Sequence, residues 1–214
     1  MEFILLILTG SAYGLAGGFS PGPTTTLVVA QSLRYGVLEG VKVAIAPALT
    51  DAPIIFVSVL FVSQMARFSA ALGLISLAGA AFLLHLAVES FRIKGVSAIG
   101  LEDRPKSIRR GFFANLLNPH PFLFWFTVGA RELLEAWQAH WLHAFAFLLG
   151  LYVCLIGAKV LVAWLVAKTR GFLQSRGYLV VNRLLGLVML VFAGRFAWDA
   201  FRLLGSVGEQ PRIL

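Results

Sequence analysis

Long apolar stretches with almost no charged side chains constrain this chain more than any other feature of its sequence. A helix needs about 20 apolar residues to cross a bilayer, and six stretches are close to that length or longer. Residues 3–33 and 111–130 contain no Asp, Glu, Lys or Arg at all, and the other stretches are 43–66, 68–88, 136–167 and 179–204. The sequence therefore predicts an all-α integral membrane protein with six transmembrane helices.

The composition supports a single membrane domain over residues 1–214. Charged residues make up 13% of the chain, against about 25% in an ordinary soluble domain. The net charge of +8 comes from basic residues that cluster between the apolar stretches. This distribution is typical of the cytoplasmic face of a membrane and leaves no basic surface for nucleic acid. Cys154 is the single cysteine, so no disulfide can form within the chain.

The distribution of Lys and Arg predicts the orientation in the membrane. Alternate loops, with the chain ends, carry twelve basic residues on one side and four on the other. Loops rich in Lys and Arg stay in the cytoplasm. We therefore expect both termini outside, with the basic loop 92–110 in the cytoplasm.

The first apolar stretch is too long for one straight helix. A helix over residues 3–33 would be about 46 Å long, against about 30 Å of hydrocarbon core. Near its middle the sequence reads Ser20-Pro21-Gly22-Pro23. Each proline removes a backbone donor and disfavours helical backbone at the residue before it. We expect a broken helix here, with the second half starting at Pro23.

The fourth stretch repeats this arrangement with Asn118-Pro119-His120-Pro121. Each proline motif lies in the first of three predicted spans, so the chain divides into two three-helix halves of opposite orientation. This layout is typical of an inverted-repeat transporter. We predict a first repeat over residues 3–91, a second over 111–204 and a short tail over 205–214, with non-helical backbone at 20–22 and 118–120.

The two breaks are candidate binding sites. Broken helices are tolerated in a membrane only inside protein or against a water-filled cavity. The N–H groups of Thr24, Thr25 and Thr26 carry the positive end of a half-helix, where a substrate carboxylate fits. A half-helix starting at Pro121 offers the same. The alternative is a simple proline kink satisfied by neighbouring hydroxyl groups.

Asp51 is the most informative single residue, because it lies near mid-depth of the second span between Pro47 and Pro53. An ionisable group there usually faces a partner or a cavity. Asp51 can bind a substrate ammonium, relay a proton, or both. The alternative is a structural ion pair with Lys159 of the fifth span. Lys159 is itself a candidate, or it extends its ammonium to the interface.

Other polar residues receive structural interpretations. Arg195 and Asp199 are four residues apart and are expected to pair with each other. Gly10, Gly14 and Gly18 predict close helix packing. His140 and His143 lie among tryptophans of an interfacial belt, so no metal site is predicted, and no cofactor is expected either.

Two motifs carry a resemblance to a known family. Gly-Gly-Phe-Ser-Pro-Gly-Pro stands at 17–23 and Gly-Phe-Phe-Ala-Asn-Leu-Leu-Asn-Pro at 111–119. With the second-span Asp, the basic central loop and the closing Asn-Arg-Leu-Leu-Gly at 182–186, the chain resembles the lysine exporter (LysE/RhtB-type) family of amino-acid exporters along nearly its whole length.

The resemblance implies a secondary exporter of amino acids or related metabolites in the inner membrane, driven by the proton gradient. Its partners would be a small-molecule substrate, protons and lipid, with a homo-oligomer possible. The family often has Gly before the second-span Asp, where this chain has Thr50, and Lys after Asn-Pro, where it has His120. These departures leave the substrate open. A channel and a membrane enzyme are the alternatives.

The predicted orientation can be tested by labelling. Cysteines placed in residues 96–106 should be shielded from an impermeant reagent added outside intact cells, because the basic loop faces the cytoplasm. Cysteines placed after Gly205 should be labelled. Labelling after permeabilisation controls for reactivity, and the opposite pattern in intact cells would overturn the orientation.

Overall fold

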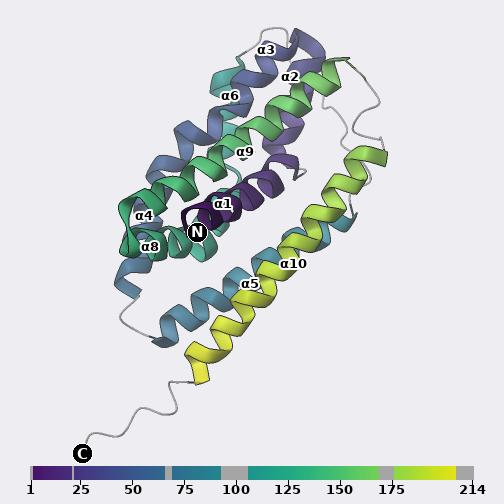
Figure 1. Cartoon of the computed structure of the whole chain (residues 1–214). Helices are drawn as coiled ribbons and strands as arrows, with labels where there is room; N and C mark the ends of the chain where they lie inside the picture. The colour runs from purple at the N-terminus through teal and green to yellow at the C-terminus, as the bar shows by residue number, and fades with distance from the viewer. Residues whose placement is uncertain (1, 21, 66–68, 93–105, 169–175, 206–214) are drawn as a thin grey trace, which may run out of the picture.

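The computed structural model describes residues 2–20, 22–65, 69–92, 106–168 and 176–205, and every regular element within them is a helix. Pro21, residues 93–105 of the basic loop and residues 206–214 of the tail lie outside the described residues. In Figure 1 the pair α5 and α10 stands to one side of the other long helices. The elements are α1 (Glu2–Phe19), α2 (Pro23–Tyr35), α3 (Val37–Ala44), α4 (Ala46–Met65), α5 (Ser69–Arg92), α6 (Ser107–Leu116), α7 (Pro119–Phe124), the π-helix η1 (Trp125–Gly129), α8 (Ala130–Ala139), α9 (Trp141–Lys168) and α10 (Arg176–Gly205).

Five helical stretches of the described chain are long and apolar enough to cross a membrane. Large apolar side chains on them point outward, among them Phe56, which is 65% exposed, and Val191, which is 72% exposed. Lipid can cover such surfaces, so the chain is a multi-pass α-helical membrane protein, as predicted. The stretches are Glu2–Phe19, Val37–Met65, Ala70–Val88, Trp141–Lys168 and Arg183–Gly205. The remaining predicted span, 111–130, lies within the shorter pieces α6, α7, η1 and α8.

The break in the first apolar stretch is confirmed. Helix α1 ends at Phe19, Gly22 has extended backbone (φ −179°, ψ 177°), and α2 begins at Pro23. Proline is favoured at this position because the first N–H groups of a helix have no acceptor within it. Both α1 and α2 pack against α9, so the interrupted stretch follows one neighbouring helix throughout.

The break in the fourth stretch lies slightly earlier than predicted. The interruption is at Leu117 and Asn118, and α7 starts at Pro119, so the prediction of a half-helix starting at Pro121 is wrong. Asn118 has extended backbone (φ −79°, ψ 124°), as expected before a proline, and its side chain accepts a hydrogen bond from the His120 N–H at 3.2 Å. This cap starts the helix two residues sooner, and Pro119 and Pro121 then fall in its first turn, where proline is tolerated.

The predicted close packing of the α1 glycines is confirmed. A Cβ atom built on Gly10 would lie 2.2 Å from the Phe147 carbonyl oxygen, and one built on Gly14 would lie 2.2 Å from the Leu151 carbonyl oxygen. Glycine at these positions lets the backbones of α1 and α9 approach directly. Because the contacts advance along both helices in the same direction, α1 and α9 run parallel.

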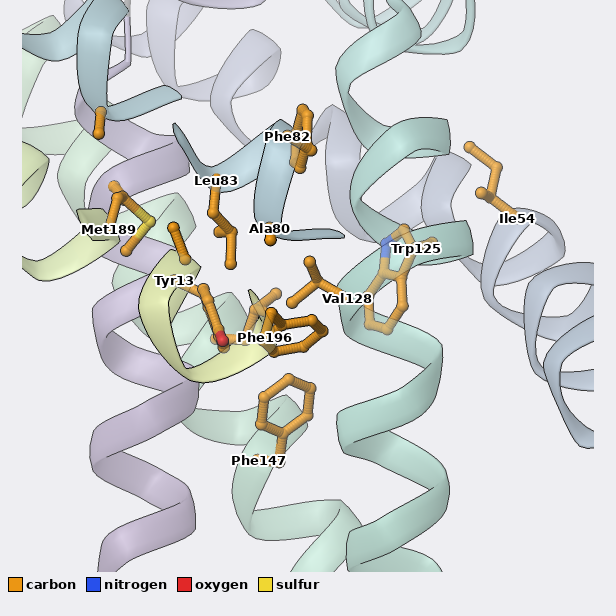
Figure 2. Packing of buried hydrophobic residues seen from close by; sticks show 14 residues of the cluster. Tyr13, Ile54, Ala80, Phe82, Leu83, Trp125, Val128, Phe147, Met189 and Phe196 are labelled. Atoms are coloured by element: carbon orange, nitrogen blue, oxygen red, sulfur yellow. The ribbon is translucent and has the colours of Figure 1, made fainter. Parts of the chain in front are cut away.

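Helices α5 and α10 pack against each other in antiparallel orientation. Gly73 near the start of α5 faces Leu204 near the end of α10, and Gly186 of α10 faces Phe91 of α5. A buried apolar cluster joins this pair to α1, α4, η1 and α9. Figure 2 shows part of this cluster, with Tyr13, Phe147 and Phe196 close together.

A charged cluster joins α8 to α10, and it corrects one prediction. Arg195 and Asp199 take partners on α8 rather than each other. Asp199 accepts from Arg131 at 2.8 Å, and Arg195 lies 2.9 Å from Glu132. Glu135 adds ion pairs with Arg131 at 2.8 Å and with Arg195 at 3.6 Å. Partners on a neighbouring helix have displaced the local i,i+4 pair.

The contact between α1 and α9 gives a stability prediction. The change Gly14→Ala places a methyl group against the backbone of α9, and overpacking of this kind costs about 1–3 kcal/mol of unfolding free energy. We expect a lower melting temperature for the purified protein in detergent. Gly157→Ala is the matched control, because nothing lies within 4 Å of its added Cβ. An unchanged melting temperature in Gly14→Ala would contradict the close approach.

Candidate functional site

The two helix breaks lie next to each other. The Thr24 hydroxyl, in the first turn of α2, donates to Oδ1 of Asn115 at 3.4 Å, across 91 residues of sequence. Asn115 lies in the last turn of α6, directly before the second break. The two breaks are therefore neighbours in space, and Asn115 is the residue that joins them.

Asp51 is held at this junction by donors from two other helices. Its Oδ1 accepts from the Asn115 side-chain amide at 2.9 Å, and its Oδ2 accepts from the Tyr152 hydroxyl at 3.1 Å. The Asn115 amide also donates to the Thr50 hydroxyl at 2.7 Å. Asp51 is only 4% exposed, so these donors replace water around a carboxylate that is costly to bury.

Lys159 is held by the first break. Its ammonium donates to the Thr25 hydroxyl at 2.9 Å and to the carbonyl oxygens of Gly17 and Gly18 at 3.4 and 3.5 Å. Those carbonyls belong to the last turn of α1, where a helix favours a cation. The Thr25 hydroxyl in turn donates to the Ser20 carbonyl at 2.8 Å. Lys159 therefore fastens the end of α1 to the start of α2.

The two buried charges face a common cavity without pairing. Within the described chain no ion pair joins Asp51 to Lys159, although both line one cavity of about 110 Å³. Tyr152 and Lys159 lie seven residues apart, which is about 10 Å along α9. A carboxylate and an ammonium are thus presented to the same space by separate networks, and the alternative of a direct structural pair is not what the structure contains.

Most of the predicted site residues gather around this cavity. Its lining includes Gly22, Thr24, Thr25, Asp51, Asn118, His120, Pro121 and Lys159. Pro23 and Thr26 lie outside the lining, and the Thr26 N–H donates to the Gly22 carbonyl at 2.8 Å, so it is not free for a ligand. Pro119 begins α7, and Pro21 is outside the described residues.

Sequence reasoning missed Asn115, Tyr152 and Thr50, which take part in the Asp51 network, and Trp125 of η1, which also interacts with the Asp51 carboxylate. The sequence does indicate that Tyr152 can take part in the site, because Tyr152 lies seven residues before Lys159 and therefore on the same face of a helix. Thr50 adjoins Asp51 directly. For Asn115 the only indication in the sequence is its position inside the 111–119 motif, and this position does not reveal a contact with Asp51. No group of three or more metal-ligating side chains comes together among the residues described.

The Asn118 cap gives a prediction for the second break. Replacing Asn118 by Ala removes the acceptor of the His120 N–H, and loss of such a cap costs about 1 kcal/mol of unfolding free energy. Thermal unfolding in detergent should show the loss. Asn118→Ser, whose hydroxyl can cap, should stay within a few tenths of a kcal/mol of the parent. Equal melting temperatures for the Ala and Ser variants would show that the cap contributes nothing.

Comparison with known protein families identifies a match over most of the chain. A family model described as LysE type translocator matches residues 15–200. The matched region contains both helix breaks, Asp51 and Lys159. No curated protein and no solved structure matches the chain at a significant level.

Proposed function

The chain belongs to the LysE type translocator family, and on this premise we propose that it is a secondary exporter of zwitterionic amino acids, coupled to the proton gradient. Membership makes it a multi-pass membrane transporter of amino acids or related compounds. The observation that carries the finer proposal is the presence of one buried carboxylate and one buried ammonium, unpaired with each other, on the wall of a single cavity.

The substrate carboxylate binds at the first break. Lys159 supplies a full positive charge there, and the start of α2 adds the positive end of a helix. Thr24 and Thr25 lie in that first turn and line the cavity. The Lys159 ammonium has three acceptors in its present contacts, and the carbonyl contacts at 3.4 and 3.5 Å are long. An anion can therefore replace a carbonyl as its partner.

The substrate ammonium and the proton share Asp51. A carboxylate binds either a proton or an ammonium as its cation, and both cannot occupy it at once. Alternation of the two at Asp51 couples outward movement of substrate to inward movement of a proton. Asn115 and Tyr152 donate to the carboxylate, so they hold its oxygens in place while the cavity side stays available.

The direction of α9 supports a sixth crossing. Helices α1 and α9 run parallel, so an even number of crossings separates their starts. The stretches α1 with α2, α3 with α4, and α5 account for three crossings. The broken stretch 107–139 then supplies the fourth, and α9 and α10 complete six. We propose that both termini face outward from the inner membrane, because the basic residues then lie in the cytoplasm.

The pairing of helices supports an inverted repeat of residues 3–91 and 111–204. The broken helix of the first half packs against α9 of the second half, and α6 and α8 of the second half pack against α4 of the first. The third helix of each half, α5 and α10, pack against each other. This pattern is unchanged when the halves are exchanged, as a two-fold relation requires.

Neutralising Asp51 tests the coupling. We expect purified Asp51→Asn to insert into liposomes but to lose proton-driven export at least tenfold, because the neutral amide takes up no proton and attracts an ammonium far more weakly than a carboxylate does. Asp51→Glu should keep part of the activity with an altered dependence on pH. The measurement is efflux of labelled amino acids from liposomes with and without an imposed pH gradient.

Glu135→Gln is the matched control, because it neutralises a carboxylate that is 48% exposed and lies in the α8 cluster. It should export at close to the parent rate. Export by Asp51→Asn at the parent rate would refute the assignment, and flux that neither saturates nor needs the gradient would indicate a channel instead.

A further inference from the structure

The cavity is polar where the helix breaks meet and apolar on its remaining walls. Most of the polar groups come from α2, α4, α6 and α9, and Tyr13 of α1, Asn118 and His120 of α7 add further polar atoms. The apolar wall is built by α5, α7, α9 and α10, through Phe82, Leu83, Leu86, Phe124, Leu155 and Met189. Figure 2 shows Leu83 and Met189 beside Tyr13, which also lines the cavity. A substrate held at its two charged groups would meet these side chains with the rest of its atoms.

The cavity has one carboxylate to pair with the substrate ammonium and one ammonium to pair with the substrate carboxylate, and it offers no further charged partner for a substrate side chain. Among the described residues of the lining, Asp51 is the one carboxylate and Lys159 the one Lys or Arg side chain. Glu132 and Asp199 lie outside the lining and are already ion-paired with arginines at 2.9 and 2.8 Å. A charged substrate side chain would therefore be buried without a partner, which is strongly unfavourable.

His120 does not supply a partner for a charged substrate side chain. It lines the cavity from the first turn of α7, and its ring packs edge-on against the rings of Phe82 and His85, with centroid separations of 6.2 and 6.3 Å. The ring is thus engaged with aromatic neighbours on α5. The cavity is also small at about 110 Å³, against about 300–1,000 Å³ for a typical ligand pocket.

Resting on the proposed function, we infer that the substrate is a neutral amino acid whose side chain is apolar and of small or medium size. Its side chain lies on the wall formed by α5 and α10. Burial of that side chain against Leu83 and Met189 favours leucine-like substrates, and the lack of a second carboxylate discriminates against lysine and arginine.

Norleucine and lysine form a matched pair of probes, because both side chains have the same unbranched run of carbon atoms and lysine adds a terminal ammonium to it. The purified full chain in liposomes, loaded with each unlabelled amino acid, is assayed by counterflow of the labelled compound, which requires no proton gradient. We expect the ratio of kcat to KM to be at least about 100-fold higher for norleucine and leucine than for lysine, because the lysine ammonium has no partner in the cavity. Glutamate should be as poor as lysine.

The outcomes separate this inference from the proposed function. Exchange of lysine as fast as norleucine, abolished by Asp51→Asn, would overturn the apolar side-chain class and leave amino-acid export intact. Exchange of neither compound nor of any other amino acid would overturn both.

The place of the substrate side chain on the apolar wall can be tested by a substitution that enlarges the cavity there. Met189 is 1% exposed, and its neighbour Leu190 is 37% exposed. Met189→Ala should raise the exchange of phenylalanine relative to leucine by roughly tenfold, because the removed side chain leaves room for a larger substrate. Leu190→Ala is the matched control on the outer face of α10 and should leave the ratio unchanged. An unchanged ratio in Met189→Ala would show that the substrate side chain does not lie on this wall.

Discussion

The interior of a bilayer offers no hydrogen bonds, so a helix that stops there must find partners for its free backbone groups within the protein. In this chain the partners are few and specific. Lys159 donates to the carbonyls of Gly17 and Gly18, the Thr25 hydroxyl donates to the carbonyl of Ser20, and the Asn118 side chain accepts from the His120 amide. Two of these side-chain groups, Lys159 and Thr25, lie where a carboxylate would bind. Under the proposed function the same groups close the breaks and form the binding surface, so we expect a substitution among them to change stability and transport together.

Two opposite charges in a low-dielectric interior attract strongly, and a fold that let them meet would have no site left between them. Here each charge has its own set of hydrogen bonds. Asp51 is held from α6 and α9, and Lys159 is held from α1 and α2. Tyr152 and Lys159 stand on one continuous helix, so α9 acts as a spacer between the two networks. The tight packing of α1 on α9 fixes one end of that spacer. The distance between the Asp51 and Lys159 charges is therefore set by the packing of the helix backbones as well as by the hydrogen bonds of the polar side chains.

Local chemistry makes part of this arrangement predictable. The Pro-Gly-Pro sequence stops α1 on its own, and a carboxylate in the middle of an apolar stretch distinguishes Asp51 by its position in the sequence alone. The start of α7 differs from the proline-based prediction because the Asn118 cap competes with the proline rule. The predicted Arg195–Asp199 pair is wrong because the partners on α8 are more than 60 residues away in the sequence. Asn115 could not be found as the link between the breaks, since its role depends on how α2, α4 and α6 pack together.

The atoms that a side chain added at a glycine would meet determine which substitutions that position can accept. At Gly10 and Gly14 the atoms nearest to an added methyl group are carbonyl oxygens of α9. Every amino acid carries that oxygen, so no exchange of side chains on α9 can restore the space, and suppressor mutations there should be absent. At Gly40 the nearest atom is the hydroxyl oxygen of Ser32, which another residue can remove. A change at position 40 therefore requires a change at position 32 and a small shift of the Ala163 methyl and the Val28 carbonyl, which would lie 3.0 and 3.1 Å from the new Cβ. Positions 10 and 14 have no side chain on α9 whose replacement would make room, so they stay glycine for as long as α1 and α9 keep their contact.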